Sequence, residues 1–551
     1  MEHLLGGTGI RRRSGRVVAL GSTAVLAAAG AGPLVMLTSS TASANAALVV
    51  STLADTGAGS LRQAMLDANS AAGVDTITFM SGLTGTIDVL SDLPHLYEGI
   101  DLQGPGASVI TIDGGWTAAG YDGDPTGHTL FVLDNLYVAD GASTISGVTI
   151  TGGNGTDNKD NSGGAIQKLY GDADLTIDDV VLTGNYSAND GGAVHLYNTG
   201  GTVTIRDSVI SNNVAYYSGG ALYSGGDGAL TLILTNVEIT GNTAGDGDGG
   251  GLYLEETDTT ISNSTIDGNV SEGNGGGISS GTGSLTISNS TIDGNVSEGN
   301  GGGIFLYYGS LTISNTTISG NEGFAGGGIY AKYLGSDLDI INSTISGNRS
   351  TSEEVGVGGG GILLNDADAV LIQSTVTANS SDATYAVGGI QSRGSGPGEY
   401  DLTLIGSIVA GNDDLDIGGS VNGSNVSVFS ECSVLGVIDP DVSLTDDGGT
   451  QVGVTDPMLG LLANNGGITK THALLAGSPA IDAGPDPIFV FDGNEFDQRG
   501  VGFARIVFGV VDAGAFEMQE PEPETTTTTT TAPTTTTTTT TNAPVVPAFT
   551  G

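Results

Sequence analysis

The segment Ile261–Ile278, ISNSTIDGNVSEGNGGGI, recurs letter for letter at Ile287–Ile304, 26 residues further along the chain. A self-match at a period of this length is typical of repeat architectures. The match weakens on either side but continues, because an aliphatic residue is followed three positions later by Asn in nine consecutive units. These residues are Asn185, Asn213, Asn242, Asn269, Asn295, Asn321, Asn348, Asn379 and Asn412. The sequence therefore predicts a repeat protein with units of about 26 to 33 residues.

A second pattern recurs with the same period: each unit also has a Gly-Gly pair or triple that is followed by an aliphatic residue. The aliphatic residues are Ile166, Val194, Leu222, Leu252, Ile278, Ile304, Ile329, Ile362 and Ile390. Between the two patterns, apolar and polar residues alternate, as in Leu285-Thr-Ile287-Ser, which is the periodicity of a strand. These patterns predict that each unit forms three short strands joined by turns, with no helix.

Such a unit cannot bury its apolar side alone and must stack on its neighbours. Equivalent strands that pair at ~4.8 Å from one coil to the next give a parallel β-helix, which we expect over residues 76–436. The repeated Asn residues, Asn185 to Asn348 above all, are predicted to form a structural ladder of stacked amides. A second polar column, also at turns where Asn and Asp tolerate a left-handed backbone, is predicted to form another structural ladder. Its members are Asp179, Asp207, Asn236, Asn263, Asn289, Asn315 and Asn342.

Composition limits the functions that remain. The chain of 551 residues carries 14 Lys and Arg against 61 Asp and Glu, a formal charge of −47. Nucleic acid is not an expected partner, because a phosphate-binding surface needs a basic patch. Polyanionic polysaccharides would also be repelled unless cations intervene, and the acidity fits a solvated extracellular surface. The single Cys432 cannot form a disulfide within the chain, so stability must come from stacking.

The N-terminal region predicts export followed by a cap. Four Arg residues precede an apolar run, Val17 to Leu37, and the small-residue pattern Ala42-Ser43-Ala44. Residues 1–44 therefore predict a secretory signal peptide, with an uncleaved anchor as the alternative. In the next region, 45–75, Ser60 and Gln63 form a capping box before the chain's one amphipathic helix pattern. We expect this helix to cover the open end of the first coil.

The repeat pattern ends before residue 437. Residues 437–518 predict loops and short strands that close the other end of the β-helix. Residues 519–551 contain runs of seven and eight Thr with few apolar residues, which predict a disordered stalk between the folded part and a cell surface.

Several segments resemble known families. TGAGSLRQAMLDAN with the following DTITF resembles the N-terminal segment, often written CSLREA, of bacterial secreted right-handed β-helix proteins, although Gly59 stands where many relatives have Cys. The GGAI and I-x-G-N patterns are similar to repeats of chlamydial polymorphic outer-membrane proteins, a family associated with adhesion. TDPMLGLLANNGGITKTHALLAGSPAIDAG, DQRG and VDAGAFE resemble the choice-of-anchor Q domain of surface proteins. The resemblance implies an all-β, right-handed, pectin-lyase-like solenoid without a single established activity.

Aromatic residues gather in the strand that follows each Gly-Gly pattern. The position after the aliphatic residue must face away from the core, and this column reads Gln167, His195, Tyr223, Tyr253, Ser279, Phe305, Tyr330, Leu363 and Gln391. The next outward column includes Tyr197, Glu255, Tyr307, Lys332, Asn365 and Arg393. Rings repeated along a sheet suit binding to sugar rings or to a partner protein, and equally suit simple stacking on one another. The candidate ligand-binding residues are His195, Tyr197, Tyr223, Tyr253, Phe305, Tyr307, Tyr330 and Lys332.

Catalysis is the alternative from another class. A calcium-dependent lyase would need clustered carboxylates and a basic residue, but Lys332 and Arg393 lie coils away from Glu255 in the sequence. A hydrolase would need paired carboxylates, and Asp178-Asp179 is the one adjacent pair in the predicted strands. Asp227, Asp246 and Asp248 are weak candidates for calcium, and no other cofactor is expected. The leading prediction is a secreted or wall-associated protein, without catalysis or a membrane span in the mature chain, that binds an extracellular glycan or surface protein.

Overall fold

The computed structural model describes residues 47–70, 72–117, 127–134, 141–155, 162–226, 228–333, 337–393, 401–419, 426–485, 496–507 and 509–519. The predicted signal peptide lies outside these ranges, and so does the predicted stalk apart from Gln519. Within the described ranges, no helix combines the length and apolarity that a membrane crossing requires.

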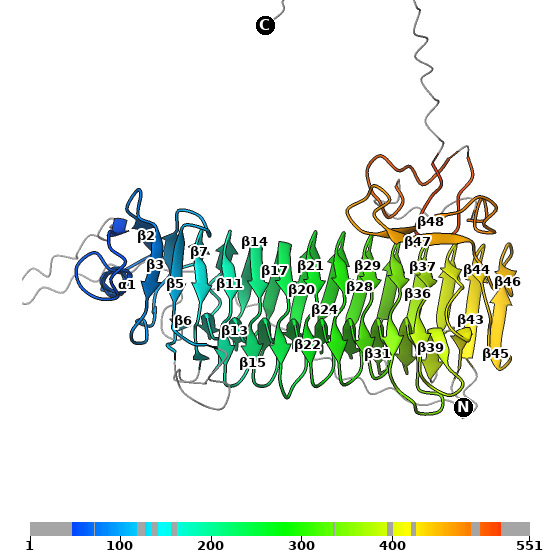
Figure 1. The fold of residues 1–551 in the computed structure, drawn as a ribbon, viewed down its shortest axis with the longest axis horizontal. Coiled ribbons are helices and arrows are strands. Elements are labelled where there is room, and N and C mark those ends of the chain that lie inside the picture. The colour runs from blue at the N-terminus through cyan, green and yellow to red at the C-terminus, as the bar shows by residue number, and fades with distance from the viewer. Residues whose placement is uncertain are drawn as a thin grey trace, which may run out of the picture. The chain divides into compact units, whose positions relative to one another are not determined.

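The strands stack in parallel columns that form three sheets, as predicted (Figure 1). The sheet that follows the Gly-Gly pattern has 11 strands: β6 Phe131–Asp134, β9 Ile166–Leu169, β13 Val194–Tyr197, β16 Leu222–Gly225, β19 Leu252–Leu254, β23 Ile278–Ser280, β27 Ile304–Tyr307, β31 Ile329–Lys332, β35 Ile362–Asn365, β39 Val387–Arg393 and β42 Leu415–Gly418. A sheet of eight very short strands was not expected from the sequence: β12 Tyr186–Ser187, β15 Val214–Ala215, β18 Thr243–Ala244, β22 Val270–Ser271, β26 Val296–Ser297, β30 Glu322–Gly323, β34 Arg349–Ser350 and β38 Ser380–Ser381.

The largest sheet has 27 strands, because two neighbouring columns are joined through the long strands β14 and β17. Its strands are β1 Ala47–Val50, β2 Asp75–Phe79, β3 Gly85–Asp88, β4 Ile100–Gln103, β5 Ile110–Asp113, β7 Ser143–Ser146, β8 Thr149–Thr151, β10 Leu175–Asp178, β11 Val181–Thr183, β14 Gly201–Ser211, β17 Leu230–Thr240, β20 Thr257–Ser262, β21 Thr265–Asp267, β24 Ser284–Ser288, β25 Thr291–Asp293, β28 Ser310–Ser314, β29 Thr317–Ser319, β32 Asp337–Ile341, β33 Thr344–Ser346, β36 Asp368–Ile372, β37 Thr375–Thr377, β40 Leu402–Ile405, β41 Ile408–Val409, β43 Val426–Glu431, β44 Val434–Leu435, β45 Val442–Asp446 and β46 Gln451–Val452.

One coil shows how the repeat produces this path. The chain runs along β23 and β24, bends at Asn289, continues through β25 and β26, and enters β27 one level higher. Asn289 has φ 50°, and the other members of the second polar column have φ between 49° and 56°. The expectation of left-handed turn residues at these positions is therefore confirmed. The aliphatic residues after the Gly-Gly pattern, such as Ile278 and Ile304, are fully buried in one continuous core.

The predicted Asn ladder is present and buried. The side-chain Nδ2 of Asn295 donates to Oδ1 of Asn321 at 2.9 Å and to the carbonyl oxygen of Ile266 at 3.0 Å, while its backbone N–H donates to the same Oδ1 at 2.9 Å. The pattern repeats from Asn185 to Asn412, and the last amide meets the carboxylate of Asp416 at 2.8 Å. Buried amides without partners would cost free energy, so this continuous bonding explains why Asn recurs at this corner.

A second ladder, of hydroxyl groups, was missed by the sequence reading. The residue directly after each left-handed turn residue is mostly Ser or Thr, and its oxygen accepts the backbone N–H of the coil before it. For example, Ser264 N–H donates to Oγ of Ser290 at 3.1 Å, and the Ser290 hydroxyl donates to the carbonyl of Ser288 at 2.7 Å. These bonds satisfy buried N–H groups that the bend removes from the strand ladder.

The single helix, α1 Leu61–Ala68, lies at the N-terminal end (Figure 1). The Ser60 side chain accepts the backbone N–H of Gln63, as the capping box predicts. Leu61 and Met65 are fully buried and join the core of the first coils. The predicted capping helix is therefore confirmed.

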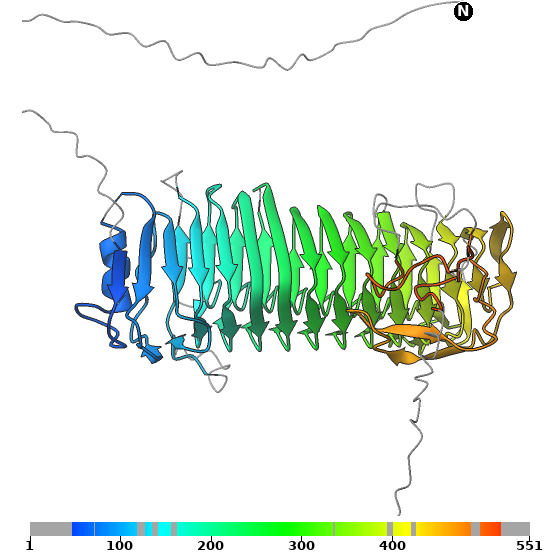
Figure 2. The same cartoon turned by 90° about the horizontal axis from the view of Figure 1, so that it is seen from above.

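The region after the last coil corrects another expectation. Residues 454–485, 496–507 and 509–519, here called the C-terminal lobe, lie beside the later coils rather than over the end of the β-helix (Figure 1, Figure 2). The lobe contains the antiparallel pair β47 Leu459–Ala463 and β48 Thr471–Leu474. It docks through outward hydroxyls of β29, β33 and β37: Thr317 donates to the carbonyl of Lys470, Thr344 donates to the Gln498 side chain, and Thr375 accepts the Ala515 N–H.

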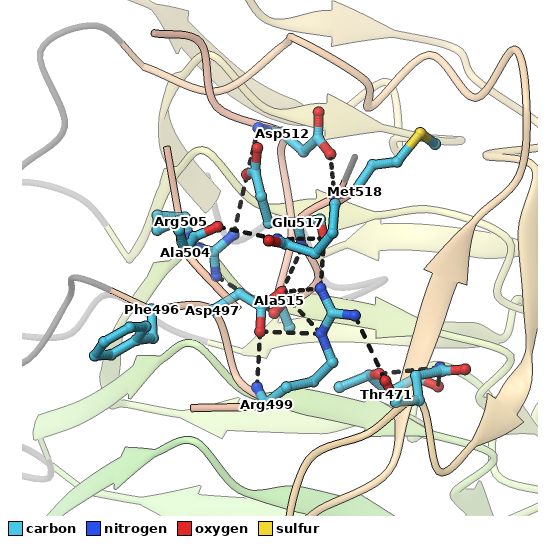
Figure 3. Close-up of polar contacts among 12 residues, drawn as sticks. Thr471, Phe496, Asp497, Arg499, Ala504, Arg505, Asp512, Ala515, Glu517 and Met518 are labelled. Atoms are coloured by element: carbon cyan, nitrogen blue, oxygen red, sulfur yellow. Dashed lines mark hydrogen bonds and ion pairs between the residues drawn. The ribbon is translucent and has the colours of Figure 1, made fainter. Parts of the chain in front are cut away.

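Five buried ionisable side chains hold the lobe together: Asp497, Arg499, Arg505, Asp512 and Glu517. Figure 3 shows their side chains converging within the lobe. Arg499 pairs with Asp497 at 2.5 Å, and Arg505 lies 3.9 Å from Glu517. Arg505 also bonds to Asn342 of the β-helix, so the cluster joins the lobe to the coils.

Candidate ligand-binding site

The outward column of the 11-stranded sheet has the register that the sequence predicts. Strand pairing places Gln167, His195, Tyr223, Tyr253, Ser279, Phe305, Tyr330, Leu363 and Gln391 side by side on consecutive coils. We call these nine positions the ring column. The column alternates with the buried aliphatic residues along each strand, as period-2 geometry requires.

The expectation that the whole ring column is open to solvent is wrong. His195, Phe305 and Tyr330 are 3%, 7% and 5% exposed, whereas Tyr223 and Tyr253 are half-buried. The segments before the Gly-Gly turns fold over the outer side of the sheet, so Phe305 and Tyr330 pack with Ala325, Val357 and Leu363 in a small apolar cluster outside the main core. The ring column is therefore a second packed layer with local openings.

The rings of the column form two separate stacks. The ring centroids of His195 and Tyr223 lie 5.1 Å apart, and those of Tyr223 and Tyr253 also lie 5.1 Å apart at an interplanar angle of 4°. A second stack joins Phe305 to Tyr330 at 5.5 Å. Ser279 occupies the coil between the two stacks and contributes no ring. Two coil steps span about 9.6 Å, so the column has room for one flat ring between Tyr253 and Phe305.

A cavity of about 300 Å³ occupies this interval, and we call it the slot. Its lining residues are Asp248, Tyr253, Glu255, Asn274, Ser279, Ser280, Gly281, Phe305, Tyr307 and Lys332. The slot therefore has aromatic walls, a floor of small residues and a polar rim. Pockets of this kind orient a ligand through a few well-placed polar groups.

The polar rim is held in place by its own contacts. The Tyr253 hydroxyl donates to Oε2 of Glu255 at 3.0 Å, and burial raises the Tyr253 pKa, so the phenol keeps its proton at neutral pH. Oδ1 of Asp248 accepts the backbone N–H of Asn274 at 2.6 Å, and burial raises the Asp248 pKa in spite of this bond. The rim thus offers both hydrogen-bond donors and acceptors.

Further rings surround the outer edge of the slot. Tyr307 and Tyr308 are 37% and 47% exposed, and Tyr308 stacks on Tyr333 with centroids 4.9 Å apart. The Lys332 ammonium lies 4.7 Å from the Tyr333 ring centroid and 5.9 Å from that of Tyr307. Attraction between the cation and the ring faces fixes the lysine at this edge.

The slot brings together residues that the sequence places far apart. Glu255 and Lys332 line one cavity but lie three coils apart, as expected, and Arg393 lies two coils beyond Lys332. The adjacent pair Asp178-Asp179 does not form a site, because Asp178 binds Arg206 at 2.7 Å and Asp179 is an exposed turn residue. Asp248, Asn274 and Ser279 were missed as lining residues. In the sequence, the small residue Ser279 within a column of rings was the one feature that indicated a cavity here.

The candidate calcium ligands are not assembled into a cluster. Asp227 lies outside the described residues, Asp246 is exposed, and Asp248 is bonded to Asn274. Over the part of the chain that the structure describes, no three His, Cys, Asp or Glu residues group together as metal ligands would.

Comparisons with known proteins bear on the fold. The family described as the right handed beta helix region matches residues 134–345 and 231–395. The solenoid is a right-handed β-helix. The chain is also similar in structure to the A-module of the mannuronan C-5 epimerase AlgE6 of Azotobacter vinelandii, with 16% identity, a TM-score of 0.40, and coverage of 71% of this chain and 97% of that one.

A second similar structure is the catalytic unit of a thermostable GH87 alpha-1,3-glucanase from Streptomyces thermodiastaticus. It shares 13% identity at a TM-score of 0.31, with coverage of 76% of this chain and 71% of that one. Neither likeness says what this chain does. No curated protein sequence matches the chain.

Proposed function

We propose that this chain is a secreted, surface-associated protein that binds a glycan, with one sugar ring held in the slot between Tyr253 and Phe305. The observation that carries the proposal is the missing ring at Ser279, which separates the two ring stacks and leaves the slot between them. A sugar presents apolar C–H faces to the two aromatic walls and hydroxyls at its edge. Those hydroxyls would meet the Glu255 carboxylate, the Asn274 amide and the Lys332 ammonium.

The decisive test fills the opening. In Ser279→Phe, the new ring would stack between the two walls and occupy the space of the sugar. Wild type and variant would be compared on an array of neutral and acidic oligosaccharides, followed by calorimetric titration with the array's strongest binder. We expect Ser279→Phe to lose at least about tenfold in affinity, equivalent to about 1.4 kcal/mol.

The matched control is Thr286→Phe, which adds the same ring to an exposed position of β24 on another sheet of the same coil. Its binding should equal that of wild type. Unchanged binding by Ser279→Phe, or no array binding by the wild type, contradicts the proposal.

Cleavage of a polysaccharide is a second candidate, favoured by one observation. Asp248 and Glu255 line the same cavity as Lys332, and burial raises the pKa of Asp248, as suits a carboxyl group that donates a proton. The lyase form of this idea also needs bound calcium. Incubation with polygalacturonate and calcium would reveal unsaturated products by ultraviolet absorbance, and incubation with neutral glycans would reveal new reducing ends. A product that disappears in Glu255→Gln would replace binding with catalysis as the function of the slot.

A further inference from the structure

A second cavity opens on the other side of the Tyr223–Tyr253 pair. It has a volume of about 310 Å³ and is lined by Ser162, Asn189, Asp190, His195, Tyr197 and Tyr223. The His195 imidazole stacks on Tyr223 and also on Tyr197, with centroids 5.7 Å apart. The cavity thus repeats the character of the slot, with ring walls and polar groups at the edge.

Two buried side chains, His195 in the cavity lining and Gln167 beside it in the ring column, carry polar atoms without hydrogen-bond partners. The His195 side chain is 3% exposed, and its Nδ1 makes no hydrogen bond. Gln167, its neighbour in the ring column, is fully buried, and neither atom of its side-chain amide has a partner. Buried polar atoms without partners cost about 1 to 3 kcal/mol each. A polar ligand that donated to or accepted from Nδ1 of His195 would recover the cost at that atom.

The two cavities lie along one line. His195 and Ser279 are separated by three coil steps through Tyr223 and Tyr253, which is about 14 Å along the β-helix axis. The half-buried edges of the two tyrosines lie between them. A chain of linked sugars could therefore enter both cavities while crossing the tyrosine edges.

Charge restricts the kind of saccharide. The second cavity contributes Asp190 and the slot contributes Asp248 and Glu255, whereas Lys332 is the one cation among the lining residues of both. Asp190 accepts the Ser218 N–H at 2.9 Å, which orients its carboxyl group. Acidic polysaccharides would be repelled from this line of carboxyls.

We infer that the second cavity is a further subsite for the same saccharide, so that the preferred ligand is a neutral oligosaccharide lying parallel to the β-helix axis. One sugar occupies the slot, another sits beside His195, and the intervening part of the chain crosses Tyr223 and Tyr253. This inference rests on the proposed function of the slot.

The test measures affinity against chain length. The full chain would be titrated with a series of neutral oligosaccharides from one to six sugars, taken from the type that binds best on the array. The shortest oligosaccharides should bind through the slot alone. For the wild type, we expect a further rise in affinity when the oligosaccharide becomes long enough to reach His195. His195→Phe keeps the stacked ring but removes the polar nitrogens, and it should reduce that rise by at least about threefold. Affinity for the shortest oligosaccharides should not change.

Asp190→Asn provides a second variant that keeps the shape of the cavity, and Thr286→Phe again serves as the control. An affinity that stops rising at the shortest binder, or a rise that survives intact in both His195→Phe and Asp190→Asn, overturns the inference. The outcome for the slot is read separately, because Ser279→Phe should weaken binding at every length. Preference for an acidic oligosaccharide over the neutral series also overturns the inference.

Discussion

Two sides of the β-helix are covered in different ways. The side formed by β29, β33 and β37 is covered by the C-terminal lobe, through hydroxyl contacts and a buried cluster of five ionisable groups. The side formed by β19, β23 and β27 is covered by its own rings and turns, and it keeps the slot open. The first side is therefore closed by polar contacts between segments far apart in the sequence. The second side is closed by stacking between neighbouring coils, which one small residue can interrupt.

The largest effect is expected when the contact between the C-terminal lobe and the β-helix is disrupted. Arg505→Met would remove the buried guanidinium that donates to the Asn342 side chain of the β-helix and to the Gly514 and Ala515 carbonyls, and each buried acceptor left without its donor costs about 1 to 3 kcal/mol. Hydrogen exchange should accelerate in β47 and β48, while β19, β23 and β27 keep their protection.

Arg206→Met is the matched control for this change, because the Arg206–Asp178 pair lies at the surface, where solvent screens the attraction between the two charges. If hydrogen exchange in Arg505→Met accelerated equally in β47 and β48 and in β19, β23 and β27, the two sides would not be stabilised independently.

A smaller effect concerns pH. The five buried groups would carry a net negative charge if all were ionised, and burial raises the pKa of Glu517 to about 8. Because this folded-state pKa exceeds the ordinary value of 4.5, the stability linked to Glu517 is complete below about pH 4.5 and is lost as pH rises through about 8. Thermal melts from pH 5 to 9 should show progressive loosening of the lobe.

Glu517→Gln should flatten that dependence. On the open side, the His195 imidazole should stay neutral over the same range, since burial lowers its pKa to about 3. A pH profile that Glu517→Gln leaves unaltered would show that other groups govern the docking of the lobe.

The smallest effect is expected on the free energy of unfolding when the slot is filled. Ser279→Phe should leave the free energy of unfolding unchanged or raise it by up to about 1 kcal/mol, because the new ring gains stacking contacts with Tyr253 and Phe305. Denaturant unfolding measures this change. A loss of stability greater than about 1 kcal/mol would mean that the opening is too small for a ring and that the column is interrupted for another reason.

The repeated part of the fold was predictable, because each coil repeats the same physical problem. The register of the Asn ladder and of the ring column followed from counting positions in the repeated units. The burial of Phe305 and Tyr330 did not follow, since it depends on how Ala325 and Val357 fold over the sheet.

The lobe was even less predictable. Thr344 and Gln498 meet although 154 residues separate them, and no local pattern marks such a contact. The slot was visible in the sequence as Ser279 among rings. Its meaning depended on whether the neighbouring rings stack, which only the structure shows.

The Asn ladder has a polarity along the β-helix axis. Each side-chain amide donates one N–H to the Oδ1 of the next Asn toward the C-terminus and the other to a carbonyl of the preceding coil, while its own Oδ1 accepts from the Asn on the N-terminal side. Asp416 stands at the C-terminal end of the ladder, where its carboxylate accepts the backbone N–H and a side-chain N–H of Asn412 and, through Oδ2, the N–H of Val437. Burial raises the pKa of Asp416, and the hydrogen bonds donated by Asn412 and Val437 oppose that shift because they favour the ionised form. The ladder therefore ends on an acidic residue that takes up its last donors, as acidic residues do at the start of an α-helix.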